Sequence, residues 1–147
     1  MRQLRAGILI SCALAMVVAM MMRSWASDEL VGLGPLGAEI CVPHEAARVC
    51  KAEPGALVPS SVTTLGYLVI AGAVAAAIGC VVGGVRRDKR MNAVILVVAG
   101  LVAFVAFQVT ALGRYAHLSS GPAFYVAIGA AVLALVGLFL PESRRTT

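Results

Sequence analysis

Four long apolar stretches without a charged residue dominate the chain. They are residues 6–22, 62–85, 91–112 and 122–140. A helix needs about 20 apolar residues to cross a hydrocarbon core of about 30 Å, and Leu4 extends the shortest stretch if Arg5 snorkels toward the lipid headgroups. A strand alone in lipid would leave its backbone amides unpaired, and the alternating pattern of a β-barrel is missing. The pattern therefore predicts four transmembrane helices.

The remaining residues form an outer loop (23–61), a short basic turn (86–90), a second outer loop (113–121) and a tail (141–147). Hydrophobic residues make up 61% of the chain and charged residues only 13%. A soluble fold of this size could not cover itself with so little polar surface. A soluble enzyme, a disordered chain and a disulfide-packed secreted miniprotein are therefore excluded. We expect residues 1–147 to form a single membrane domain.

Basic residues are distributed unequally between the two predicted sides of the membrane. Eight lie on one side (Arg2, Arg5, Arg86, Arg87, Lys89, Arg90, Arg144 and Arg145) and four on the other (Arg23, Arg48, Lys51 and Arg114). The positive-inside rule places both termini in the cytoplasm, as expected for a multi-pass protein of the plasma membrane. The net charge of +5 does not indicate a nucleic-acid partner, because the basic residues punctuate apolar runs and form no face with aromatics.

The aromatic residues support the same orientation. Trp25, Tyr67, Tyr115 and Tyr125 all fall near the outer interface, where amphipathic rings favour headgroup depth. A signal peptide cleaved near Ser24-Trp25-Ala26 is an alternative for the first stretch. Its cleavage would leave three spans in the same orientation.

Two of the four cysteines, Cys41 and Cys50, lie in the outer loop. A disulfide is the expected state for such a pair on the oxidising side of a membrane. The alternatives are a metal site and unpaired or redox-active thiols. Cys41, His44 and Cys50 would supply only three ligands, whereas a structural zinc takes four. Cys12 and Cys80 fall inside predicted spans and are expected to pack as small apolar residues.

The outer loop allows two local structures. Gly32-Leu33-Gly34-Pro35-Leu36-Gly37 predicts tight turns. Residues 39–42 and 48–51 could form two short strands, whereas residues 44–48 favour a helical turn. The predicted fold class is therefore an all-α membrane protein, a four-helix transmembrane bundle with a disulfide-pinned outer loop. A short β-hairpin in that loop remains one of the two alternatives.

This organisation resembles the claudin and peripheral-myelin-protein superfamily. That family has four spans, a long first outer loop, and a loop motif of a Trp, Gly-Leu-Trp and a Cys pair. Here Trp25 is followed by Gly32-Leu33 and then by Cys41 and Cys50, but Gly34 stands in place of the second Trp. The loop is also short for a claudin, and six residues separate Gly34 from Cys41. The resemblance implies the Cys41–Cys50 disulfide and a structural or adhesive role.

The predicted spans hold no ionisable residue, which argues against a pump, an ion-coupled transporter or a membrane hydrolase. We therefore expect no catalytic residue, metal or cofactor. They do offer packing surface, because Gly72, Ala76, Cys80 and Gly84 recur at every fourth position. Such a small-residue ridge suits close helix contact, either inside the bundle or with another subunit. Gln108, about a turn below the outer end, is expected to bond to a neighbouring helix, with a ligand contact as the alternative.

The expected function is therefore non-enzymatic. The chain would act as a structural, adhesion or accessory subunit through its helices and its outer loop. Its partners would be the lipid bilayer and other membrane subunits or further copies of itself. A thiol–disulfide or quinone-linked redox protein using Cys41 and Cys50 is one alternative, although a Cys-x-x-Cys pair is missing. A small transporter or channel subunit is the other.

Overall fold

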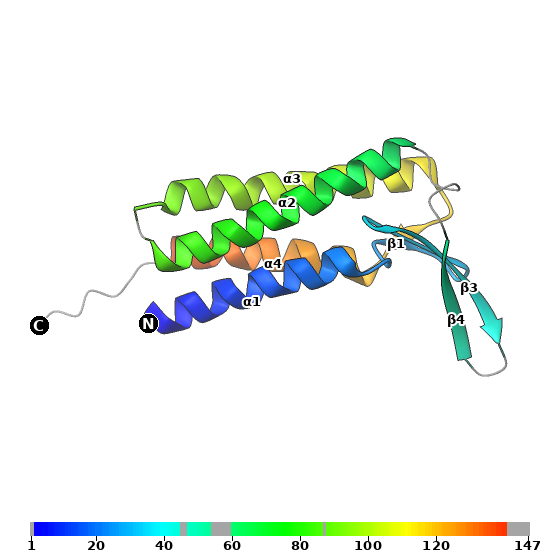
Figure 1. Cartoon of the computed structure of the whole chain (residues 1–147), viewed down its shortest axis with the longest axis horizontal. Coiled ribbons are helices and arrows are strands. Elements are labelled where there is room, and N and C mark those ends of the chain that lie inside the picture. Colours follow the sequence, from blue (N-terminus) through cyan, green and yellow to red (C-terminus); the bar gives the residue numbers. More distant parts are fainter. Residues whose placement is uncertain (1, 45–46, 54–59, 87, 141–147) are drawn as a thin grey trace, which may run out of the picture.

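Four helices lie side by side and carry a small sheet at one end (Figure 1). This computed structural model describes residues 2–44, 47–53, 60–86 and 88–140. The helices are α1 (Arg2–Met21), α2 (Ser60–Val85), α3 (Arg90–Arg114) and α4 (Pro122–Phe139). All four are long and apolar enough to cross a membrane. The chain is therefore a multi-pass membrane protein.

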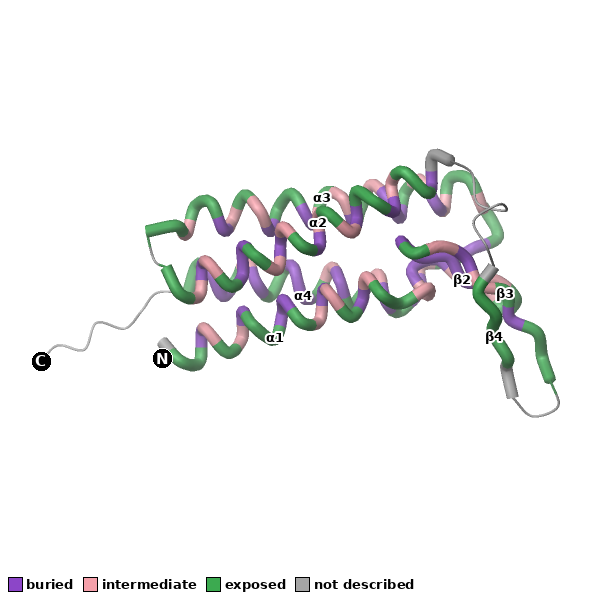
Figure 2. Tube along the Cα trace, in the orientation of Figure 1, coloured by how far each residue is buried: buried purple, intermediate pink, exposed green. Residues whose placement is uncertain are grey.

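The helices pack in a closed ring in which α1 contacts α2 and α4, and α3 contacts the same two helices. The most extensive contact is between α2 and α3. Buried residues line the inner faces, while exposed apolar residues follow the outer faces where lipid would lie (Figure 2). Small alanines supply much of the buried surface of α4, which lets the helix approach its neighbours closely.

Helix α1 begins earlier than the predicted span and includes Arg5. The Arg5 side chain is only 9% exposed, and its Nη2 donates a hydrogen bond to the carbonyl of Gly83 at 3.2 Å. The prediction that Arg5 snorkels to the headgroups is therefore wrong, and the bundle is not free of charge. A charged side chain is tolerated there because the carbonyl that it bonds lies in the last turn of α2, where helix carbonyls lack internal partners.

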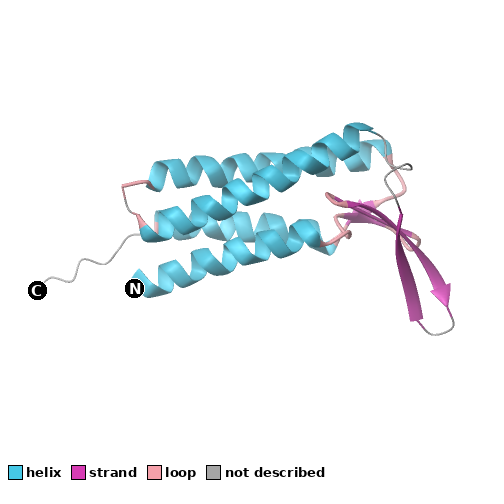
Figure 3. Ribbon diagram, in the orientation of Figure 1, coloured by secondary structure: helices cyan, strands magenta, loops and turns pink. Residues whose placement is uncertain are grey.

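A five-stranded antiparallel sheet covers one end of the bundle (Figure 3). Its strand order is β4-β3-β2-β1-β5, with β1 (Ala26–Ser27), β2 (Val31–Gly34), β3 (Gly37–His44), β4 (Ala47–Glu53) and β5 (Ser119–Ser120). The first outer loop supplies four strands and the second supplies β5. The all-α class is therefore too narrow, although the chain is mostly helical.

The loop's local structure also becomes clear. Strands β3 and β4 form a hairpin, which decides between the two alternatives for this segment; residues 45–46 lie outside the described part. The tight turn predicted for residues 32–37 is confirmed at its centre, while Gly32 and Gly34 pair with Glu39 and Gly37 as part of β2. The reversal follows at Pro35 and Leu36, and Gly37 takes the positive φ of 123° that closes it.

Candidate functional site

Trp25 anchors the sheet to the bundle. It is 0% exposed and meets the rings of Phe104 and Phe107 edge-on, at centroid distances of 5.4 and 5.7 Å. Its indole Nε1 donates to the carbonyl of Ala19 in the last turn of α1 at 2.7 Å, and the same carbonyl accepts from the Met22 amide at 3.2 Å. Trp25 is therefore a core residue. The prediction that its ring sits among lipid headgroups is wrong, whereas Tyr67 and Tyr125 are largely exposed.

Backbone hydrogen bonds around Trp25 join the sheet to helix α4. The Trp25 amide donates to the carbonyl of Leu33 in β2 at 3.1 Å. The carbonyls of Ser24 and Trp25 accept from the amides of Ala123 at 3.3 Å and Gly121 at 2.8 Å. Ala123 lies in the first turn of α4, whose amides have no partners within the helix. One short segment thus ties β2 and α4 together.

Two glycines allow the sheet to approach the helices closely. A Cβ on Gly34 would lie 2.6 Å from the carbonyl oxygen of Met22, and one on Gly66 would lie 2.5 Å from that of Pro35. Real side chains do not fit at such distances. The backbone around Gly34 therefore leaves no room for a larger side chain, including the Trp ring that the resemblance would place there. The motif residue Leu33 is buried and faces Ala26 across the ladder.

Gln108 of α3 reaches the sheet from below. Its side chain is 3% exposed, and Nε2 donates to Oγ of Ser120 in β5 at 2.9 Å. The predicted partner on a neighbouring helix is therefore wrong. The partner is a two-residue strand from the second outer loop, which in turn pairs with β1. The Oε1 atom of Gln108 is buried and has no hydrogen-bond partner among the described residues.

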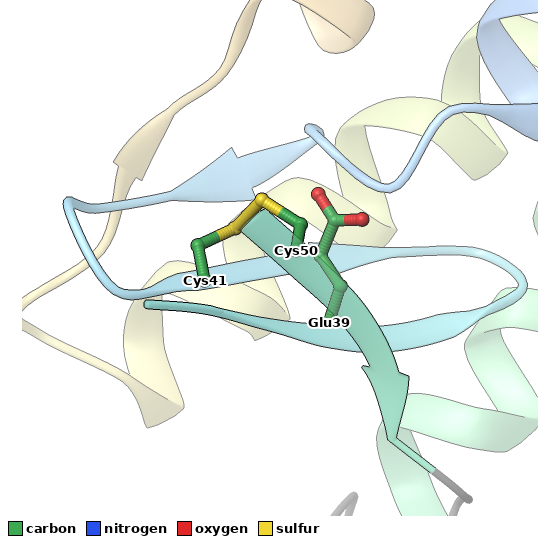
Figure 4. A group of neighbouring side chains, drawn as sticks. All are labelled: Glu39, Cys41 and Cys50. Carbon is green, nitrogen blue, oxygen red and sulfur yellow. A yellow bond between two sulfur atoms is a disulfide. The ribbon is translucent and has the colours of Figure 1, made fainter. Parts of the chain in front are cut away.

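Farther from the bundle, the strands β3 and β4 continue as what we call the outer hairpin, residues 40–44 and 47–51. Cys41 and Cys50 face each other across it and form a disulfide, with their Cα atoms 4.0 Å apart (Figure 4). The predicted disulfide is confirmed. Glu39 lies on the same face, and a carboxylate oxygen lies within 4.8 Å of both sulfurs.

The alternative metal set of Cys41, His44 and Cys50 is not assembled. Both sulfurs are bonded to each other, and a disulfide sulfur is not the thiolate that binds zinc. His44 also lies three positions from Cys41, and successive strand residues point to opposite faces. His44 therefore belongs to the other face of the hairpin. The side chain that does lie beside the two sulfurs is that of Glu39. Glu39 is two positions from Cys41, so the two-residue repeat of a strand predicts that both lie on one face.

The opposite face of the outer hairpin is apolar and accessible. Ile40, Val42 and Val49 are exposed to solvent, with Val42 at 58% and Val49 at 45%. Together with His44 and Lys51 they line a shallow depression of about 450 Å³. Exposed β-branched side chains gathered on one strand face are typical of a contact surface.

The predicted small-residue ridge on α2 divides between two neighbours. A Cβ on Gly72 would lie 2.9 Å from Cβ of Ala103, and one on Gly100 would lie 2.8 Å from Cβ of Ala76, so this part faces α3. The atoms nearest to Gly84 belong instead to α1. Each step of four residues advances about 40° around a helix of 3.6 residues per turn, so the ridge rotates from one neighbour to the next.

Cys80, the remaining ridge residue, is fully buried, and Cys12 in α1 is 6% exposed; neither forms a disulfide. Both ends of the ridge contact helices of the same chain. Comparison of the chain with known protein families, characterised proteins and solved structures found no match. The function is therefore argued from the geometry of the outer sheet.

Proposed function

We propose that this protein is a non-enzymatic subunit of the plasma membrane that works through contacts. It acts as a structural, adhesion or accessory component, with claudin-like topology and both termini in the cytoplasm. Its helices meet the lipid bilayer and neighbouring subunits, and its outer sheet meets partners outside the membrane.

The observation that carries this proposal is the contrast within the sheet. The part near the bundle is anchored by the buried Trp25, while the outer hairpin exposes Ile40, Val42 and Val49. A sheet fixed to four helices holds such a surface in a constant position relative to the membrane. Because the surface is already held in place, less conformational entropy is lost when a partner binds to it. A contact protein benefits from this arrangement.

The order of the motif along the chain supports the claudin-like reading. Trp25 directly precedes β1, the Gly32-Leu33 pair lies in β2, and the disulfide joins β3 to β4, which is the chain order that the resemblance implies. Gly34 departs from the family motif, and its close contact with Met22 gives a reason for the departure. The proposed likeness rests on the four spans and on the chain order of these residues, and it does not identify the partner.

The double variant Val42→Thr/Val49→Thr tests the contact surface. Threonine keeps the β-branched shape that strands favour and replaces one methyl group by a hydroxyl. Each lost apolar group is worth about 0.8 kcal/mol when buried in a contact, so the two together should weaken association about tenfold. Chemical crosslinking in membranes and clustering of protein-loaded vesicles measure lateral and vesicle-to-vesicle association.

Leu30→Gln is the matched control, because the Leu30 side chain is comparably exposed in the same loop but is not among those that line the depression, although its carbonyl accepts a hydrogen bond from the Cys41 amide. It should leave both measurements unchanged. If the hairpin variant associates as strongly as the unchanged protein, the surface does not make the contact. An equal loss in the Leu30→Gln variant would show that general surface polarity, and not this face, controls association.

A further inference from the structure

The C-terminal end of α2 lies at the end of the bundle opposite the sheet (Figure 1), and Gly83 belongs to its last turn. From α1, Arg5 donates a hydrogen bond to its carbonyl at 3.2 Å. A Cβ on Gly83 would lie 2.9 Å from Cβ of Ala93 in α3 and would collide with the side chain of Leu138 in α4. Residues of α1, α3 and α4 therefore all lie against this one position of α2.

Three arginines surround this junction. Besides the buried Arg5, Arg86 follows Gly83 by one helical turn, and its amide still donates to the carbonyl of Val82 at 2.7 Å. Arg90 precedes Ala93 by one turn on α3. Because Gly83 and Ala93 are in contact, the backbones of Arg86 and Arg90 lie at a similar level of the bundle, each about one turn nearer its end.

Arg90 is held in place but incompletely satisfied. Its guanidinium lies 5.3 Å from the centre of the Phe139 ring, a cation–π contact that fixes its direction. Its Nε is buried and has no hydrogen-bond partner among the described residues. The first turn of α3 carries no acid, and Asp88 is the one carboxylate that the described residues of this end contribute. With Lys89 also present, positive charge exceeds negative charge.

An apolar belt lies next to these charges. Val85, Met91 and Phe139 are all large and mostly exposed, and each belongs to the last or first turn of its helix. A small soluble anion would gain no binding energy from these apolar side chains. A phospholipid would place its acyl chains along it and its phosphate among the arginines.

We propose that this end of the bundle binds the headgroup of an anionic phospholipid. Arg86 and Arg90 contact the phosphate, since guanidinium groups donate paired hydrogen bonds to phosphate oxygens. Arg5 is a positioning residue, because it fixes the last turn of α2 on which Arg86 stands. Basic clusters at the ends of transmembrane helices recognise anionic lipids in this way.

The test measures thermal stabilisation of the purified protein in neutral detergent on titration with dioleoyl phosphatidylglycerol or dioleoyl phosphatidylcholine. Phosphatidylglycerol should stabilise the protein at lower concentration than phosphatidylcholine. Each basic residue near an anionic surface contributes about fivefold to affinity, so Arg86→Gln/Arg90→Gln should weaken the phosphatidylglycerol effect about 25-fold. Arg86→Lys/Arg90→Lys keeps the charge but loses the paired hydrogen bonds, and should recover part of that loss.

Arg23→Gln/Arg114→Gln removes two charges from the opposite end and should bind phosphatidylglycerol as the unchanged protein does. Three results would overturn the proposal: equal stabilisation by both lipids, an equal loss in the opposite-end variant, or full stabilisation by inorganic phosphate alone. The last result would indicate a site for a soluble anion. Detergent exposes both ends of the protein to added lipid, so the outcome depends neither on the orientation in the membrane nor on the proposed contact function.

Discussion

The two halves of the outer sheet are stabilised by different means. The base, formed by β1, β2 and β5, is buried against the helices by Trp25, Ala26 and Leu33. Among the outer-hairpin residues whose burial is described, 40–44 and 49–51, Cys41 is the one that is buried, and the hairpin relies on the disulfide. Packing fixes the base, whereas a covalent bond fixes the part that extends away from the bundle.

This difference follows from how much apolar surface each half can remove from water. A two-stranded hairpin alone is marginally stable in water. The outer hairpin cannot bury Ile40, Val42 and Val49 without losing the face that we propose as its contact surface. A disulfide stabilises it without covering that face. We therefore expect that loss of the Trp25 packing destabilises the base, and that loss of the disulfide destabilises the outer hairpin alone.

Removing the ring of Trp25 should have the largest effect. Trp25→Ala deletes a fully buried side chain with its two edge-on ring contacts and its bond to Ala19. Large-to-small changes of this kind cost about 3–5 kcal/mol. We expect the base to detach from the bundle and the protein to unfold at a markedly lower temperature in detergent. Thermal unfolding and proteolysis of the whole outer loop measure these effects.

Tyr125→Ala is the control for Trp25→Ala, because Tyr125 also carries a large ring near this end but is exposed. It should leave the unfolding temperature nearly unchanged. If the two variants lose equal stability, the sheet is not anchored by the tryptophan. The comparison between a packed base and a covalently held hairpin would then fail.

The next largest effect should come from Cys41→Ser/Cys50→Ser. Closing a ring of this size stabilises a chain by about 2–3 kcal/mol, and here that stabilisation belongs to the outer hairpin alone. We expect proteolysis within the hairpin while the helices unfold at an unchanged temperature. Loss of the whole bundle would show that the two halves are one cooperative unit.

The disulfide also separates the contact function from the redox alternative. A structural bridge should stay closed when the purified protein is mixed with a small dithiol at low concentration as reductant, with a quinone present to reoxidise any thiols that form, as mass mapping without reduction would show. Repeated opening and closing with consumption of quinone would contradict the proposed function. It would establish a redox role for Cys41 and Cys50.

The sequence predicted the helices well and the sheet poorly, for a physical reason. The length of an apolar run is a local property, and it located all four helices to within a few residues at each end. Strands β1 and β5 have two residues each and exist only because Ala26 pairs with both Leu33 and Ser120. No local pattern in the sequence contains such pairings. Trp25 was placed in the lipid interface for the same reason.

Arg5 and the α2 ridge show a similar limit. Arg5 lies close to Gly83 in space but 78 positions away in sequence. The ridge residues Gly72 and Gly84 were grouped by spacing alone, and the helical repeat directs them to different helices. The cysteine pair could be predicted because both partners lie in one short loop, on the side that the charge distribution marks as oxidising.

The smallest effect should come from Gln108, which joins the bundle to the edge of the base. Gln108→Leu removes the bond to Ser120 but also removes a buried carbonyl oxygen that has no partner among the described residues. Hydrogen bonds between side chains in membrane proteins average about 0.6 kcal/mol, so the net loss should stay below about 1 kcal/mol.

A double-mutant cycle isolates this bond from the other effects of each substitution. Gln108→Leu, Ser120→Ala and the double variant should give a coupling energy of about 0.6 kcal/mol, measured by reversible unfolding in detergent. Strand β5 pairs with β1 through only two residues, so losing this bond should also raise hydrogen exchange at Ser119 and Ser120. Exchange in the outer hairpin should not change, because β3 and β4 receive no support from Gln108. A coupling energy of zero would mean that the backbone ladder alone holds β5. Faster exchange in the hairpin would mean that the base and the hairpin are supported together, contrary to the division between them.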